Sequence, residues 1–185
     1  MAAVDYFLKV DGIQGESQNK THKDEIQVLS WQIGGKVPVS ATGVGGMAGG
    51  KVKFAELVIT KVLDKSSPKL LKALCGGQHI KTATLSCCKA GTGNTSSDFV
   101  VIKLSDIMIS GLEIRTGGAH PSSKNSTESK DVQSKGHTQT EIEAEIEELK
   151  LAFSKIEYEY KSQGKDGTFS TSATMSYDVP QNLVG

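Results

Sequence analysis

Apolar and polar side chains alternate with a period of two along much of this chain of 185 residues. In the first such stretch, Asp5 and Lys9 lie between apolar residues at alternate positions, which are Val4, Tyr6, Leu8 and Val10. Successive side chains of a β-strand point to opposite faces, whereas those of a helix repeat about every 3.6 residues. The alternation therefore predicts a half-buried strand here and a mainly β fold for the chain.

Further strands are predicted from the same pattern over residues 24–33, 51–62, 80–89, 99–104, 107–114 and 149–160, with a short one around residues 175–177. The apolar phase changes within two of them, near Glu56 and around Ser154-Lys155. One extra residue in a strand moves all later side chains to the other face. Both places are therefore predicted to hold a bulge or a bend.

The stretch 24–33 has one apolar face and one polar face. Leu29, Trp31 and Ile33 share the first, and Ser30 and Gln32 share the second. If the apolar face belongs to the core, the side chains of Ser30 and Gln32 point outward toward water.

One helix is predicted after Ser67, a good N-cap residue, with Pro68 at its first position. Its apolar face is expected to consist of Leu70, Leu71 and Leu74. Two glycines, Gly76 and Gly77, should end it. Many short strands with a single helix favour an antiparallel β-barrel or sandwich of two packed sheets. We expect one such domain over residues 1–185.

Two segments do not fit a compact domain. Residues 34–50 are rich in glycine and carry four scattered apolar residues, Val37, Val39, Val44 and Met47. Residues from about 119 to 148 are polar and rich in Ser, Lys and Thr. Loops of this length are uncommon unless they are functional or disordered. We interpret residues 34–50 as an extended loop that makes contacts with another molecule.

The acidic run EIEAEIEELKLAF, residues 141–153, has two periodicities. Ile142, Ala144 and Ile146 alternate with glutamates, as in a strand, but Ile142, Ile146 and Leu149 also share one face of a helix. A helix, an extended strand and a disordered segment all remain open for residues 140–150.

Charge and composition exclude several classes of protein. The 21 basic and 21 acidic residues balance, which argues against a nucleic-acid partner. No apolar run is long enough to span a membrane, and the N-terminus lacks the pattern of a signal peptide. Three cysteines, two of them adjacent, are a poor disulfide framework. We expect a chain that folds in the reducing cytoplasm.

Motifs for catalysis or cofactors are weak. The segment GGMAGGKV, residues 45–52, resembles a phosphate-binding loop, but it lacks the Ser or Thr that binds magnesium and precedes a strand. The four histidines, His22, His79, His120 and His137, lack metal-site spacing and are interpreted as surface residues. Cys87 and Cys88 are interpreted as small strand residues. We therefore predict no enzyme, no cofactor and no metal.

Several stretches, in order and spacing, resemble the haemolysin-coregulated protein (Hcp) family, the tube protein of the bacterial type VI secretion system. They are VDYFLKVDGIQGES (4–17), HKDEIQVLSW (22–31), AGGKVKF (48–54), DKSSPKLLKAL (64–74), GQHIKTATLS (77–86), LAFSKIEYEYKSQ (151–163), DG and YDV. The resemblance covers nearly the whole chain outside residues 119–148. There, about twenty residues after Thr127-Glu128-Ser129 look like an insertion.

The resemblance implies a β-barrel of two sheets with one flanking helix, assembled into a homohexameric ring. Such rings stack into a tube inside a contractile sheath, meet a trimeric spike at the tip, and carry small effector proteins in the lumen. It implies a protein that is cytoplasmic before firing and secreted afterwards. On this basis, Val37, Val39, Val44 and Met47 are expected to contact the next ring, and Ser30 and Gln32 to face the lumen.

Two other classes stay open from the residues alone. One is a monomeric β-barrel that binds a small ligand or a peptide. The other is a hydrolase on a β scaffold. Its only support in the sequence is the presence of ordinary acidic side chains.

Overall fold

The computed structural model describes residues 4–42, 46–90, 96–115, 145–164 and 169–185. Most of them belong to one nine-stranded sheet, made of β1 (Val4–Val10), β2 (Ile26–Val28), β3 (Ser30–Gln32), β8 (Leu57–Val62), β9 (His79–Ala90), β10 (Ser96–Arg115), β11 (Ile146–Gln163), β12 (Phe169–Asp178) and β13 (Leu183–Val184). All pairings in this sheet are antiparallel. The predicted mainly β, antiparallel fold with one helix is confirmed.

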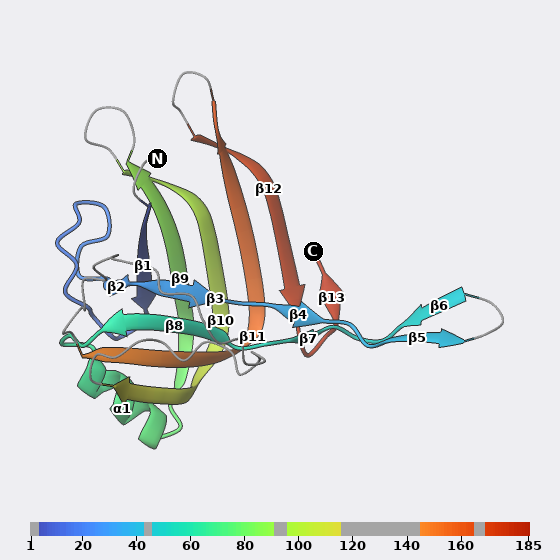
Figure 1. The fold of residues 1–185 in the computed structure, drawn as a ribbon, viewed down its shortest axis with the longest axis horizontal. Helices are drawn as coiled ribbons and strands as arrows, with labels where there is room; N and C mark the ends of the chain where they lie inside the picture. Colours follow the sequence, from blue (N-terminus) through green and yellow to red (C-terminus); the bar gives the residue numbers. More distant parts are fainter. Residues whose placement is uncertain (1–3, 43–45, 91–95, 116–144, 165–168) are drawn as a thin grey trace, which may run out of the picture.

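The sheet folds over on itself, so the two packed layers expected from the sequence belong to one continuous sheet. β10 and β11 form a long hairpin that runs through both layers. β11 pairs with β8 over Ile146–Leu151 and with β12 over Lys155–Gln163. Figure 1 shows β8, the first part of β11 and the end of β10 running across the direction of β1 and β9. We call these crossing strands, with β3, the second layer. The strands that run along β1 and β9 form the first layer.

Residues 26–32 join the two layers. The first half of this segment, β2, pairs with β1, and the second half, β3, pairs with β8. β8 pairs with β11, which leads back through β10 and β9 to β1. The path of pairings from β8 to β1 is thus joined at its two ends by the chain segment 26–32 and not by a further strand pairing.

The apolar core lies between the layers. Its fully buried members include Leu8, Leu85, Ile102 and Leu104 from the first layer and Leu57, Ile59, Leu149 and Leu151 from the second. All of these come from the alternating stretches, so the period-two pattern correctly located the strands that supply these core residues. Burial of such side chains is the main force that holds the layers together.

The change of phase in β11 has a different cause from the predicted bulge. The pairing of β11 with β10 stays in step across Ser154, from Ser105↔Lys155 to Ile107↔Phe153. Asp106, between these two residues of β10, has a positive φ of 51°, and the Ser154 hydroxyl donates a hydrogen bond of 2.8 Å to its carboxylate. The hairpin therefore bends at Asp106. The separate strands predicted over 99–104 and 107–114 are one bent strand.

The face assigned to Leu29 was wrong. Ile26 and Val28 are buried, whereas the side chain of Leu29 is 44% exposed. The backbone N–H of Leu29 donates to the carbonyl of Thr60 at the point where the segment leaves β1 for β8. The alternation of core-facing and outward-facing side chains shifts by one residue there, so Trp31 rather than Leu29 lies on the core side.

The helix α1 (Ser67–Cys75) begins one residue earlier than predicted, with Ser66 as its N-cap and Pro68 in its first turn. Leu70 and Ala73 are its buried apolar residues, while Leu71 is exposed, contrary to the expected face. Gly76 caps the C-terminus and Gly77 follows with φ +55°, so the two glycines do end the helix.

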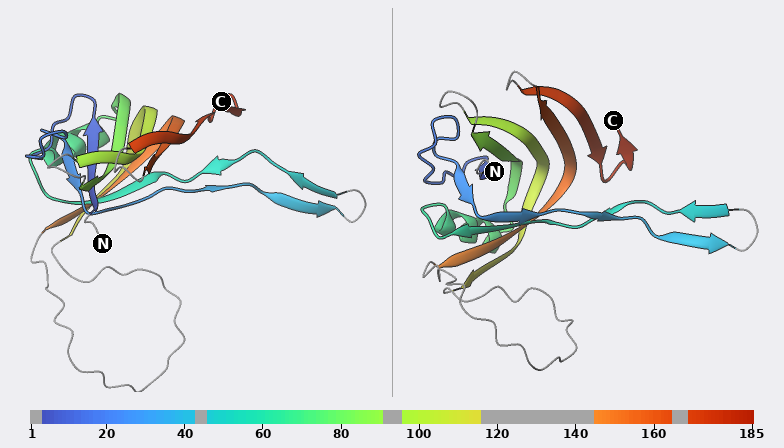
Figure 2. Two further views of the ribbon diagram at one scale, coloured as in Figure 1. Left: turned by 90° about the horizontal axis from the view of Figure 1, so that it is seen from above. Right: turned by 45° about the horizontal axis from the view of Figure 1, so that its top comes forward.

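Residues 34–50, expected as a loop, are mostly strand. β4 (Gly35–Lys36), β5 (Val39–Thr42), β6 (Gly46–Gly49) and β7 (Lys53–Phe54) form a long hairpin, which we call the arm. Figure 2 shows the arm projecting far from the two layers. The strand predicted over 51–62 is interrupted after Phe54 and resumes at Leu57, which agrees with the change of phase near Glu56.

The end of the segment interpreted as an insertion belongs to the sheet. Ile146, Glu147 and Glu148 pair with both β8 and β10, so the strand alternative is confirmed from Ile146 onward. Glu147 is fully buried beside Lys61 of β8, so this glutamate of the acidic run faces the core and not solvent. The rest of the insertion up to residue 144 lies outside the described residues.

Candidate functional sites

The arm is a narrow two-stranded ribbon. Val39–Thr42 pairs with Gly46–Gly49, and Gly50 donates a backbone hydrogen bond to the carbonyl of Pro38. A Cβ atom at position 50 would lie 2.8 Å from the Pro38 ring, so a glycine is required where the two strands meet. The glycine at position 50 therefore allows the two strands to approach closely at this point.

Two of the four predicted contact residues are exposed on the arm. The side chains of Val37 and Val39 are 47% and 58% exposed. Val44 lies outside the described residues. Met47 lies in β6, but its side chain is outside what the structure describes. Because the arm projects from the two layers (Figure 2), the two valines have little of their own chain to pack against.

The base of the arm is held by aromatic contacts. The ring of Phe54 lies 5.3 Å from that of Tyr177 in β12 and 5.8 Å from that of Phe153 in β11. Gly35, on the partner strand, pairs with Phe54 and lies beside its ring. Aromatic pairs at these separations stabilise a fixed geometry. The arm thus starts from an anchored base.

Ser30 and Gln32 are exposed on β3, as predicted. Ser30 lies opposite Thr60 and Gln32 opposite Val58. Side chains at directly opposed positions of an antiparallel pair share a face.

Continuing across the ladder, Thr60 lies opposite Glu148 and Val58 opposite Lys150. The outer surface of the second layer therefore carries a polar row, which we call the polar face, of Ser30, Gln32, Thr60, Glu148 and Lys150.

Ion pairs organise this polar face. The Arg115 guanidinium lies 2.8 Å from the Glu148 carboxylate, and the Lys150 ammonium lies 3.5 Å from the same residue. Thr60, Glu148 and Lys150 were missed in the sequence, although each alternates with core residues such as Ile59 and Leu149. The signal was present in the alternation, but only the register across strands shows that they lie beside Ser30 and Gln32.

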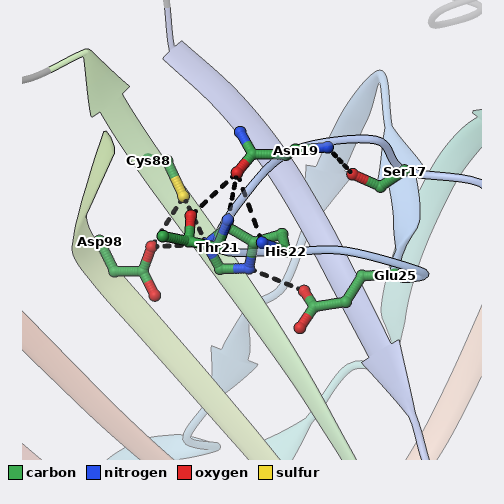
Figure 3. A network of polar contacts seen from close by, with 7 residues as sticks. All are labelled: Ser17, Asn19, Thr21, His22, Glu25, Cys88 and Asp98. Atoms are coloured by element: carbon green, nitrogen blue, oxygen red, sulfur yellow. Dashed lines mark hydrogen bonds and ion pairs between the residues drawn. The ribbon is translucent and has the colours of Figure 1, made fainter. Parts of the chain in front are cut away.

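A second polar group forms around His22 on the outer surface of the first layer, away from the core (Figure 3). His22, in the loop between β1 and β2, lies over Phe7 with the two ring planes 4° apart and the centroids 4.6 Å apart. Its Nε2 lies 3.0 Å from Oδ1 of Asp98 and 3.1 Å from Sγ of Cys88. Its Nδ1 lies 2.8 Å from Oε2 of Glu25.

This cluster contradicts the interpretation of His22 as a surface histidine. His22 is 6% exposed and Cys88 is 2% exposed. Cys88 and Asp98 are direct cross-strand partners in β9 and β10, next to an irregularity in the register at Phe99. His22 is 66 positions from Cys88 in the chain, so no local spacing reveals the cluster. Only the fold brings these residues together.

The surroundings of Cys88 do not favour a nucleophile. Its thiol donates a hydrogen bond of 2.7 Å to Asp98. Burial, this hydrogen bond and the negative charge of Asp98 raise the pKa of the Cys88 thiol. Reactive cysteines need a lowered pKa, because the thiolate is the attacking species. The Cys88 thiol therefore keeps its proton and serves as a hydrogen-bond donor.

Among the described residues, no helix has the length and apolar character needed to cross a bilayer.

Comparisons with known proteins match these features to one family. The family described as "Type VI secretion system effector, Hcp" matches residues 7–160 of the chain. Protein hcp1 of Pseudomonas aeruginosa is 35% identical over 117 residues, which are 63% of this chain and 70% of that protein.

Solved structures share the fold. A crystal structure of Hcp1 from Salmonella typhimurium is similar with a TM-score of 0.70 and 29% identity, over 100% of both chains. A structure of a type six secretion system protein has a TM-score of 0.79 at 23% identity, covering 99% of this chain and 100% of that one. The second likeness concerns the fold alone.

Proposed function

The chain belongs to the Hcp family of type VI secretion system proteins, and we propose that it acts as a non-enzymatic tube subunit whose homohexameric rings stack through the arm. In this proposal the tube carries small effector proteins in its lumen and meets a trimeric spike at its tip. A contractile sheath ejects it, so that a cytoplasmic protein becomes a secreted one. No cofactor is needed for these steps.

The observation that carries the proposal is the projecting arm with its exposed valines. A two-stranded hairpin is marginally stable by itself in water. Val37 and Val39 expose apolar surface on such a hairpin, so a partner that covers them stabilises it. A second ring supplies this partner at every position, because each copy both offers an arm and receives one.

Charge supports self-association rather than binding to a strongly charged partner. The formal net charge is zero, so copies of the chain do not repel one another strongly. The polar face supports the lumen assignment, because a water-filled channel that passes folded effectors needs a polar wall. Ser30 and Gln32 would then be effector contacts, together with the missed residues Thr60, Glu148 and Lys150.

The proposal is tested by the mass of the assembly and by removal of the arm. Light scattering after size-exclusion chromatography should give six times the 19.6 kDa chain mass. Deletion of Val37–Gly49 should still give six times the mass of the shortened chain and should abolish tubes seen by electron microscopy.

Two results would contradict the proposal. A monomer mass across micromolar concentrations would reject the ring and favour a monomeric binding protein. Long tubes formed by the deletion variant would reject stacking through the arm.

A further inference from the structure

Three potential metal ligands from distant parts of the chain converge on the outer surface of the first layer. Nε2 of His22, Sγ of Cys88 and Oδ1 of Asp98 all lie within 4.8 Å of one another. His22 and Cys88 are buried, while the Asp98 side chain is 27% exposed. The cluster therefore has an enclosed side and one side, at Asp98, that reaches solvent.

The histidine is held in place by its surroundings. Glu25 faces Nδ1, and Phe7 stacks beneath the ring, so Nε2 is aimed at Cys88 and Asp98 (Figure 3). Local hydrogen bonds also fix the backbone of the loop that carries His22. The side-chain oxygen of Asn19 accepts hydrogen bonds from the backbone N–H groups of Thr21 and His22. Metal-binding histidines commonly present their second nitrogen to a carboxylate in this way.

We propose that His22, Cys88 and Asp98 bind one Zn²⁺ ion per chain, with water in the fourth position on the side of Asp98. Zinc prefers a tetrahedral set of nitrogen, sulfur and carboxylate ligands, which these three side chains supply. A thiolate and a carboxylate balance the charge of the ion, and neutral His22 adds the third ligand. Glu25 acts as a positioning residue, because it contacts His22 and not the ion.

The separations allow the ion with a small movement. Zinc bonds of about 2.0–2.3 Å in a tetrahedron place the ligand atoms about 3.3–3.6 Å apart. The three atoms are now 2.7, 3.0 and 3.1 Å apart, as expected for a hydrogen-bonded cluster. Opening the cluster by less than about 1 Å would therefore admit the ion.

Binding also displaces protons. The ion replaces the hydrogen on Sγ of Cys88 and any hydrogen on Nε2 of His22, and these protons pass to solvent. Because only the folded chain brings the three ligands together, the ion would fix the loop between β1 and β2 onto β9 and β10. Zinc should therefore stabilise the folded chain.

The test uses tag-free full-length protein and Co²⁺ as a spectroscopic substitute for zinc. Other metal-binding groups, namely Cys75, His120 and His137, are first replaced by Ser, Gln and Gln. In this background we expect one Co²⁺ per chain, with intense tetrahedral absorption and a thiolate-to-cobalt charge-transfer band. Zn²⁺ should displace the cobalt and raise the melting temperature.

Variants assign the ligands. Cys88→Ser should remove the charge-transfer band, while His22→Gln or Asp98→Asn should keep the thiol but abolish one-to-one binding. Glu25→Gln should retain the band and weaken binding roughly 10- to 100-fold. Two matched controls should bind as the background does. Cys87→Ala removes the neighbouring thiol on the core side, and His79→Gln breaks the exposed pair of His79 with Asp106.

The absence of a charge-transfer band in the folded background protein would overturn the proposal, whatever the variants do. A band that survives Cys88→Ser would overturn it as well. Circular dichroism in the presence of a chelator establishes that each variant is folded. If Cys88→Ser fails to fold, loss of one-to-one binding in folded Asp98→Asn supports the site, and unchanged binding there overturns it.

Discussion

The Lys61 ammonium lies 2.7 Å from the Glu147 carboxylate, and neither side chain is exposed to solvent. The two residues are direct cross-strand partners in β8 and β11, at core-facing positions that continue the series of Leu57, Ile59, Leu149 and Leu151. The Ser67 hydroxyl donates a hydrogen bond of 2.6 Å to the same oxygen of Glu147. The pair therefore joins the two strands to the start of α1.

Breaking this pair on one side should destabilise the chain strongly. Glu147→Leu leaves the buried Lys61 ammonium with only the Asp64 carboxylate, 3.0 Å away, and breaking a buried pair on one side costs up to about 3–5 kcal/mol. The double variant Lys61→Met/Glu147→Leu should recover most of this loss, because both fully buried charges are then gone and Asp64 is partly exposed. Denaturant unfolding measures the difference. As a control, Glu157→Gln removes the exposed partner of Lys103 and should cost less than about 1 kcal/mol. Equal stability of the single and double variants would contradict the argument.

Charge on the arm should block stacking without affecting rings. In the double variant Val37→Asp/Val39→Asp, two exposed valines become carboxylates. Covering these charges with a neighbouring ring costs free energy, because they would be buried without partners. We expect the hexamer mass to remain and tubes to disappear in electron micrographs. Leu71→Asp changes another exposed apolar residue, on α1, and should still form tubes. Equal tube formation by both variants would remove the valines from the stacking contact.

A bulky residue on the polar face should reduce effector retention. Gln32→Trp adds a large side chain on β3, repeated six times around one channel in the proposed ring. We expect an intact hexamer that retains less effector in pull-downs. Gln27→Trp is the matched control, because Gln27 is also exposed but lies on β2, opposite Phe7 of the first layer. Unchanged retention with Gln32→Trp would place Gln32 outside the lumen.

Alkaline pH should weaken the fold through Cys87. Burial raises the pKa of its thiol from 9.0 to about 11. A group whose pKa is raised in the folded state contributes stability that is complete below pH 9 and is lost as the pH rises through 11. The free energy of unfolding should therefore fall by roughly 2–3 kcal/mol over this interval because of Cys87.

Unfolding of the variant Cys87→Ala at several pH values checks this expectation. The variant should lose that part of the alkaline dependence, whereas Cys75→Ala, at an exposed position, should keep it. A parallel decline of wild type and Cys87→Ala would show that other groups cause the loss.

Alternation in the sequence was sufficient to predict the strands and the core, because half-buried strands must separate apolar from polar side chains. It could not predict the arm, since its glycine-rich sequence carries no regular alternation of apolar and polar residues. Nor did it distinguish Lys61 and Glu147 from surface charges, because their burial depends on one register between β8 and β11. The His22 cluster could not be predicted for the same reason, because the fold brings together residues that are far apart in the sequence.

The position of Glu147 also determines where a deletion of the insertion can end without damage to the sheet. A deletion that extends to Glu148 removes the partner of Lys61 and the strand positions on either side of it, so it would test folding rather than stacking. A deletion from residue 130 to residue 144 leaves β11 complete. That boundary is visible only from the pairing of Ile146 with Val62 and Arg115.

The short segment 26–32 has a mechanical consequence under the forced ejection that we propose for this chain. β2 and β3 have three residues each, whereas β10 and β11 have twenty and eighteen. A load that peels the layers apart is thus resisted by few hydrogen bonds at this seam and by many along the long hairpin. Rupture should begin between β3 and β8. Single-molecule pulling with handles at Gln32 and Val58 should therefore show an early event at low force, which pulling across β10 and β11 would lack.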